Sequence, residues 1–281
     1  MGWNWFKRKK IDGIRKHKKV KLGIAFGGGG ARGVALIGVV KAFEEIGITA
    51  DYISGTSVGA IIGSALAYGK NSAYMHDVVK SIRMKDIRNS KFIWKPSYAK
   101  NIENLLLKVF EKDVMFSELK IPFTAVCTDL SSGKEAHISA GSVAKAVSGS
   151  CAVPGIFTPV EFGEMMLVDG MLKNNVPADV ARNMGANIVV AIDLHENRGA
   201  GTVSTKLFPV LSSSLGVLLQ SNVEQKLKYA DLVITPDLDK YSSTKIGDID
   251  EMINIGYNSV MEKKDEIVKL LSRKPKKRKY E

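Results

Sequence analysis

The fold of this 281-residue chain is decided at residues 21–33, which read KLGIAFGGGGARG, and at residues 51–59, which read DYISGTSVG. Each stretch begins with a short apolar run, passes through glycines and leads into a segment with helical spacing of its apolar residues. The first of these segments has its apolar residues at Leu36, Val39, Val40, Phe43 and Ile46. Two successive units of strand, glycine turn and helix predict an α/β fold with a mostly parallel sheet.

The rest of the chain continues this alternation. Further strands are expected at residues 122–129, 135–139, 167–169, 188–193 and 232–235. Further helices are expected at residues 60–68, from Pro177 onward, through 211–219 and over 249–271. Residues 72–120 have a polar helical pattern, broken at 94–96, and we consider 72–112 a candidate lid. We therefore expect a three-layer fold, in which helices cover both faces of a mostly parallel central sheet.

The net charge of +12 is concentrated at the two ends of the chain. Residues 1–21 hold nine Lys or Arg and one Asp, and residues 269–281 hold seven Lys or Arg and one Glu. The intervening residues therefore have a net charge of −2. We expect three parts: a basic, aromatic tail at 1–19, a globular domain at 20–268 and a second basic tail at 269–281. The 25% of charged residues is an ordinary share, which excludes disorder of the whole chain.

The N-terminal tail places Trp3, Trp5 and Phe6 beside the cationic run Lys7–Lys10. Aromatic side chains favour the membrane interface, and each cation near an anionic surface adds about 1 kcal/mol of attraction. This pattern predicts an anionic membrane surface as a partner. Two alternatives are a solubilising tail and a segment that binds nucleic acid or an import receptor. Because the globular part has no basic face, we expect no nucleic-acid partner.

Several features bear on the location of the protein. The two cysteines, Cys127 and Cys151, cannot form a disulfide framework and match no zinc pattern. No stretch approaches eighteen consecutive apolar residues, and the N-terminal segment lacks the apolar core of a signal peptide. We therefore expect a cytoplasmic protein that is peripheral on the inner face of the membrane. The sequence sets no expectation for the oligomeric state.

The first glycine turn contains Gly28, Gly29, Gly30, Ala31, Arg32 and Gly33, which fit the dinucleotide-binding pattern G-x-G-x-x-G after a strand. That function also requires an acidic residue at the end of the second strand, whereas Asp51 stands at its start. The glycines supply backbone N–H groups at the positive end of a helix, which suit any anion. A tetrahedral oxyanion fits this loop as well as a phosphate does.

The second glycine turn, Gly55–Gly59, is a G-x-S-x-G pattern between a strand and a helix, which is the setting of a nucleophile elbow. Such a turn presents the hydroxyl of Ser57 above the sheet. The serine needs a base, and His195 is the candidate among the four histidines. Asp169, followed by Gly170 at the end of an apolar strand, is the alternative. An elbow serine beside a row of oxyanion donors indicates acyl transfer.

Taken together, these residues resemble the patatin-like phospholipase family. The resemblance covers residues 20–235 and includes the glycine loop, the Ser57 elbow and the Asp169-Gly170 pair. It is supported by the run from Ser150 to Pro154 and by the run from Asn174 to Pro177. One departure is Met171, since members of the family usually have Gly or Ala at this position. We expect Met171 to bear on the size of the pocket.

The resemblance implies a Ser57–Asp169 dyad without histidine, an oxyanion hole formed by Gly28, Gly29 and Gly30, and no cofactor. With no calcium-loop spacing of carboxylates, we expect catalysis without a metal. Arg32 is a candidate contact for a lipid phosphate, although it also fits a solvated position on a helix. The implied function is cleavage of lipid acyl esters, of the phospholipase A or lysophospholipase type. The alternatives are a Ser–His esterase or acyltransferase using His195, and a non-catalytic nucleotide-binding module.

Overall fold

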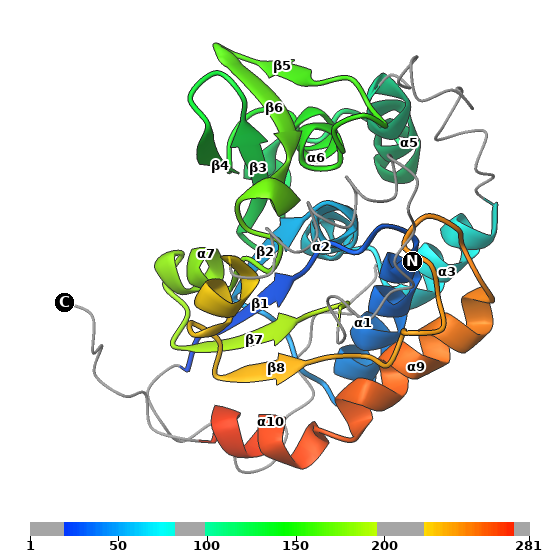
Figure 1. Ribbon diagram of the computed structural model, residues 1–281. Coiled ribbons are helices and arrows are strands. Elements are labelled where there is room, and N and C mark those ends of the chain that lie inside the picture. Colours follow the sequence, from blue (N-terminus) through cyan, green and yellow to red (C-terminus); the bar gives the residue numbers. More distant parts are fainter. Residues whose placement is uncertain (1–19, 82–98, 196–221, 273–281) are drawn as a thin grey trace, which may run out of the picture.

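A computed structural model describes residues 20–81, 99–195 and 222–272, and these form one sheet of eight strands with helices packed against it (Figure 1). The strands are β1 (Leu22–Phe26), β2 (Tyr52–Thr56), β3 (Phe123–Asp129), β4 (Lys134–Ile138), β5 (Val160–Phe162), β6 (Met165–Asp169), β7 (Ile188–Ile192) and β8 (Leu232–Ile234). Their order in the sheet is β5-β6-β3-β2-β1-β7-β8, and β4 also pairs with β3. The predicted α/β class is confirmed.

Five neighbouring strands run parallel, so their carboxyl ends meet at one edge of the sheet; in sheet order they are β3, β2, β1, β7 and β8. The register places Phe26 beside both Gly55 and Ile192 at this edge. The outer strands β4, β5 and β6 belong to antiparallel pairs. The sheet is thus mostly parallel where the two glycine turns begin and antiparallel beyond β3.

The helices are α1 (Ala35–Glu45), α2 (Val58–Tyr68), α3 (Ser72–Ser81), α5 (Lys100–Phe110), α6 (Val143–Ser150), α7 (Ala178–Asn183), α9 (Ile249–Met261) and α10 (Lys264–Leu271), with short 3-10 turns at Gly30–Val34, Phe116–Glu118 and Gly170–Leu172. In Figure 1, α1 and α9 lie along each other on one side of the sheet, whereas α7 lies on the other. Among the described residues, helices therefore cover both faces, as predicted.

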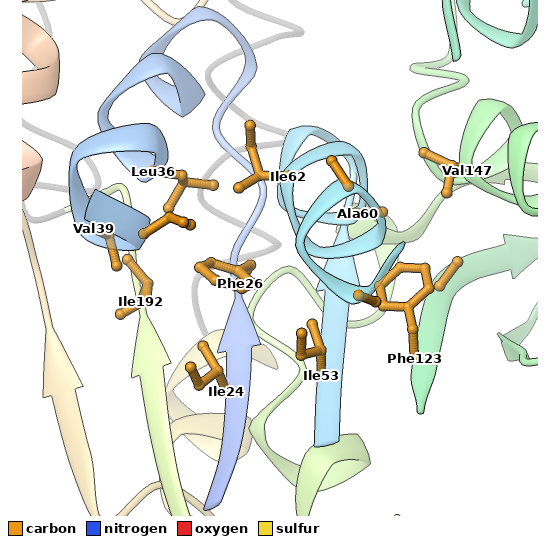
Figure 2. Close-up of a cluster of buried hydrophobic side chains, with 14 of the residues drawn as sticks. Ile24, Phe26, Leu36, Val39, Ile53, Ala60, Ile62, Phe123, Val147 and Ile192 are labelled. Carbon is orange, nitrogen blue, oxygen red and sulfur yellow. The ribbon is translucent and has the colours of Figure 1, made fainter. Parts of the chain in front are cut away.

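The alternation of side chains along the strands creates two hydrophobic cores. Ile24 and Phe26 of β1 point into the larger core, which contains α1 and α2, and Figure 2 shows Leu36, Ile62 and their neighbours packed there. Ala25, between them, points into the smaller core under α7. The smaller core is rich in alanine, so α7 packs closely on the sheet. This packing keeps residues 174–177, which precede α7, next to the glycine turns.

The sequence pattern was less accurate outside the parallel strands. One helix was expected over 249–271, but the structure has α9 and α10, which are separated at Glu262 and Lys263. The break contains no Gly or Pro that could have signalled it, and Asp265 and Glu266 suit the first turn of a new helix. The short strand β5 was also missed. The expected helix through 211–219, the break at 94–96 and both basic tails lie outside the described residues.

The core makes a testable prediction about stability. Phe26 is fully buried between α1, α2 and the sheet, so Phe26→Ala should lower the free energy of unfolding by about 3–5 kcal/mol in urea denaturation. Leu130, at 51% exposure, is the matched control, and Leu130→Ala should change stability by less than about 0.5 kcal/mol. Equal effects of the two substitutions would contradict this description of the core.

Candidate active site

Ser57 occupies a strained turn between β2 and α2. Its φ of 54° and ψ of −127° lie in a region that a residue with a side chain rarely adopts, at a cost of about 1–3 kcal/mol. The turn is possible because Gly59 follows: a Cβ there would lie 2.2 Å from the carbonyl oxygen of Phe26. The sequence prediction of a nucleophile elbow is therefore correct in its backbone geometry.

A neighbouring serine supports this strained turn. The backbone N–H of Ser57 donates to Ser150 Oγ at 2.9 Å, and Ser150 Oγ donates to the carbonyl oxygen of Val126 at 2.6 Å. Ser150 is completely buried at the end of α6. From the sequence, Ser150 is only part of a supporting motif, because nothing in its local pattern indicates a contact with a residue 93 positions away.

The glycine loop after β1 lies directly beside the elbow. A Cβ on Gly28 would be 3.2 Å from the Cβ of Ser57. The structure corrects one detail of the predicted oxyanion hole: the N–H of Gly28 already donates to the carbonyl oxygen of Asn175, at 3.0 Å. Among the described residues, the N–H groups of Gly29 and Gly30 have no acceptor. Two of the three predicted donors are therefore free to bind an anion.

Asp169 reaches the same edge of the sheet by a route that the sequence did not reveal. The prediction placed it at the end of a parallel strand, but β6 runs antiparallel to β3. β3 continues past the parallel edge, and β6 returns along it, so that Asp169 stands beside Cys127. The adjacent residue of β3, Val126, pairs with Thr56. Two pairings across β3 thus bring Asp169 next to the residue that precedes Ser57.

The carboxyl group of Asp169 is fully buried. Burial raises its pKa to about 7, although the hydrogen bond from the Met171 backbone and the proximity of the Ser57 side chain act to lower the pKa. In the described part of the chain, Oδ2 has no hydrogen-bond partner. Its Oδ1 accepts the N–H of Met171 at 2.9 Å. Met171 thus contributes its backbone to the site, while the expected effect of its side chain on the pocket stays a prediction. A carboxylate with this pKa, beside a hydroxyl, can accept a proton near neutral pH.

Two buried thiols border the carboxyl group. Burial raises the pKa of both Cys127 and Cys151 well above the ordinary value, and the charge of Asp169 raises it further. Both cysteines are free and uncharged at neutral pH, so they contribute to the low polarity around Asp169.

Arg32 is tied to the backbone of two loops. Its Nε donates to the carbonyl oxygen of Tyr241 at 2.8 Å, and its Nη1 donates to that of Leu194 at 3.3 Å. The interpretation of Arg32 as a solvated helix residue is therefore wrong. The contact with a lipid phosphate stays a prediction, and two of the guanidinium donors are already in use.

His195, the alternative base, follows β7 on the other side of the glycine loop. Its backbone N–H donates to Asp193 Oδ1 at 3.2 Å, and its neighbour Leu194 packs against Gly29. Asp169 is connected to the Ser57 turn through the pairing of β6 with β3 and of β3 with β2, and His195 belongs to none of these strands. The structure therefore favours Asp169 as the partner of the serine.

The structure removes the support for dinucleotide binding. Asp51, the candidate ribose ligand, accepts the N–H of Leu22 at 2.9 Å through Oδ2. This contact is at the beginning of β1 and β2, at the opposite end of the strands from the glycine loop. In the described part of the chain, no group of three or more His, Cys, Asp or Glu side chains could hold a metal ion.

The backbone geometry, the buried carboxyl group and the free N–H groups match the chemical requirements of acyl transfer, and the comparison with known proteins identifies the family. The family model described as patatin-like phospholipase matches residues 24–182, more than half of the chain. The chain belongs to the patatin-like phospholipase family. The matched span contains the glycine loop, Ser57 and Asp169.

Curated relatives of this patatin-like chain are much longer proteins. It is 27% identical over 270 residues to mouse patatin-like phospholipase domain-containing protein 7, and this match covers 84% of the chain and 20% of the relative. It is 28% identical over 268 residues to lysophospholipase nte1 of Emericella nidulans, covering 84% of the chain and 18% of the relative. The chain thus spans about a fifth of the length of these relatives.

A solved structure has the same fold at low sequence identity. VipD from Legionella pneumophila superimposes with a TM-score of 0.63 at 13% identity, covering 89% of this chain and 68% of VipD. Within the described ranges, no helix combines the length and the apolar character needed to cross a bilayer.

The buried carboxyl group predicts how stability depends on pH. Because the folded state raises the pKa of Asp169 to about 7, the ionised group costs stability, and this cost grows as the pH rises from about 4 to about 7. Asp169→Asn keeps an acceptor for the Met171 N–H and removes the charge. The variant should therefore be the more stable protein at pH 8, by at most about 4 kcal/mol in urea unfolding.

A second aspartate serves as the control of opposite sign. Hydrogen bonds from the side chain of Ser132 and from backbone N–H groups lower the pKa of Asp129. Its contribution to stability is present at neutral pH and is lost as the pH falls, so Asp129→Asn should destabilise the protein at pH 7. A variant of Asp169 that is less stable than the wild type at pH 8 would contradict the assignment of a buried, destabilised carboxylate.

Proposed function

We propose that this protein is a serine acyl hydrolase that cleaves lipid acyl esters, with Ser57 as the nucleophile and Asp169 as the general base. One observation carries the proposal: a fully buried carboxyl group, with a pKa of about 7 and with Oδ2 unpartnered among the described residues, lies one strand away from a serine on a strained turn. The free N–H groups of the adjacent glycine loop support it, because acyl transfer develops negative charge on the carbonyl oxygen.

In the first half of the reaction, Asp169 accepts the proton of the Ser57 hydroxyl as Oγ attacks the ester carbonyl carbon. The carbonyl oxygen becomes an oxyanion, which accepts hydrogen bonds from the N–H groups of Gly29 and Gly30. The intermediate then collapses: the bond to the alcohol oxygen breaks, and protonated Asp169 returns the proton to that oxygen. The products are the free alcohol and an acyl ester of Ser57.

In the second half, Asp169 accepts a proton from water while the water oxygen attacks the acyl carbon. The same N–H groups bind the second oxyanion. The bond to Ser57 Oγ breaks, and the proton on Asp169 passes to this oxygen. The fatty acid leaves, and both residues regain their starting states. The same carboxylate thus acts in both halves, which is possible because its pKa lies near the working pH.

The names of the relatives suggest the substrates to test first. The Emericella nidulans relative is named a lysophospholipase and the mouse relative a phospholipase domain-containing protein. We therefore propose that phospholipids or lysophospholipids are the substrates, with neutral glycerides as a comparison.

Substitution of the dyad tests the mechanism. Ser57→Ala and Asp169→Asn should each lower kcat at least about 1,000-fold on lysophospholipid, since each removes a group that bonds to the reacting atoms. In the wild type, kcat/KM should rise with pH through about 7 as Asp169 loses its proton. Fatty-acid release measured by mass spectrometry between pH 5 and 9 gives both results.

The control is His195→Ala, which should keep most of the activity. Loss of activity in this variant, together with an active Asp169→Asn, would favour the Ser–His alternative. A fluorophosphonate probe should label the wild type and fail to label Ser57→Ala. Equal labelling of both proteins, or of neither, would contradict the proposal of a serine hydrolase.

We also propose that the basic ends hold the enzyme at the anionic inner face of the membrane, where its substrates lie. The support is the sequence itself: aromatic residues stand beside Lys7–Lys10, and a second basic run occupies residues 273–279. The sum of several cationic attractions of about 1 kcal/mol each is sufficient for reversible association.

Vesicle binding tests this proposal. A variant without residues 1–19 should bind vesicles containing 30% phosphatidylserine at least about tenfold more weakly than the wild type, as measured by co-sedimentation. Replacing Trp3, Trp5 and Phe6 by Ala, with the lysines retained, separates the aromatic contribution from the electrostatic one. Undiminished binding of the truncated protein would contradict the proposal.

A further inference from the structure

The segment Asn174–Pro177 connects the Asp169-Gly170 pair to α7 and lies next to both glycine turns. Its carbonyl oxygens accept three hydrogen bonds from these neighbours: Thr56 Oγ1 donates to Asn174 at 2.8 Å, Gly28 N to Asn175 at 3.0 Å and Ser54 Oγ to Pro177 at 2.8 Å. The mechanism above uses none of these residues of the segment. One of them, Asn175, also contacts the glycine loop through its side chain.

Asn175 bonds to both peptide groups of Gly28. Its carbonyl oxygen accepts the Gly28 N–H, and its Nδ2 donates to the Gly28 carbonyl oxygen at 3.2 Å. Asn175 is 8% exposed, so this second bond is shielded from water. The contact is also close: a Cβ on Gly28 would lie 2.5 Å from Asn175 Oδ1, so a larger residue there would displace the Asn175 side chain.

The second bond determines the direction of an oxyanion donor. The carbonyl of Gly28 and the N–H of Gly29 belong to one trans peptide, in which they point in opposite directions. A bond that fixes the carbonyl toward Asn175 therefore directs the Gly29 N–H away from Asn175. Glycine peptides rotate at little steric cost, so without this bond the plane could turn and present the carbonyl oxygen where the N–H is needed.

We propose that Asn175 is a positioning residue for the oxyanion hole, which holds the Gly28–Gly29 peptide so that its N–H faces the developing charge. This inference rests on the proposed function and adds to it a residue that touches neither the substrate nor Ser57 Oγ. The hydrogen bond from the Gly28 N–H to the backbone of residue 175 remains in every side-chain variant. Substitution of Asn175 therefore removes only the side-chain bond that orients the Gly28–Gly29 peptide.

Kinetics of Asn175→Ala and Asn175→Ser on lysophospholipid test the proposal, because neither side chain reaches the Gly28 carbonyl oxygen. In both variants kcat should fall by roughly 10- to 100-fold, and KM should change less than about threefold. The reason is that an oxyanion donor that points in the wrong direction stabilises the transition state little more than an absent donor does. A trifluoromethyl ketone analogue, which forms a tetrahedral adduct with serine, should lose affinity by a similar factor. A non-hydrolysable ether analogue of the substrate should bind as it does to the wild type.

Ser54→Ala is the matched control. It removes a buried hydrogen bond to the same segment, at Pro177, without touching the glycine loop. It should lower the unfolding temperature about as much as Asn175→Ala and keep kcat within about twofold of the wild type. The unfolding temperature of Asn175→Ala could lie more than about 5 °C below that of Ser54→Ala. In that case Asn175→Ser, which keeps a polar side chain at this position, decides the test.

The outcomes separate this inference from the proposed function. A wild type that hydrolyses no lipid ester contradicts the function itself. With an active wild type, the positioning role is overturned if the folded Asn175 variant keeps kcat and the affinity for the trifluoromethyl ketone. It is also overturned if affinity for the ether analogue falls by the same factor as kcat, because the residue would then support the site as a whole.

Discussion

The arrangement of the site depends on hydrogen-bonded register across β3. Thr56 pairs with Val126 on one side of this strand, and Asp169 pairs with Cys127 on the other. Because strand spacing is nearly constant at about 4.8 Å, these two pairings fix the distance between the Ser57 turn and the Asp169 carboxyl group. A shift of one residue between β6 and β3 would turn Asp169 to the other face of the sheet, and a shift between β2 and β3 would do the same to Thr56.

Several unfavourable features are concentrated at this point. Ser57 has a strained backbone, Asp169 is buried with its pKa raised to about 7, and the glycine loop has N–H groups without an acceptor in the part of the chain that the structure describes. Each feature lowers stability, and each is useful for acyl transfer, which needs an exposed hydroxyl, a base and oxyanion donors. The large core around Phe26 and the hydrogen bonds of Ser150 and Asn175 hold these features in place.

The prediction from sequence was best where a local pattern carries the chemistry. A G-x-S-x-G turn between a strand and a helix has few conformations, so Ser57 could be assigned from five residues. The strand that carries Asp169 was predicted, but its direction was not, since strand direction depends on pairing partners far away in the chain. For the same reason the sequence indicates Ser150 and Asn175 only as motif residues. It also does not reveal that the Gly28 N–H donates to the carbonyl oxygen of Asn175.

The sequence by itself determined the strand–turn–helix units, the serine turn at Ser57 and the separation of a nearly neutral globular part from two basic ends. These features depend on neighbouring residues, whose periodicity and backbone preferences act over short distances. Only the tertiary structure decided which carboxyl group lies near Ser57, which N–H groups of the glycine loop have no acceptor among the described residues and why the pKa of Asp169 is raised. Each of these depends on burial and on hydrogen bonds between residues far apart in the chain, and no local pattern specifies them.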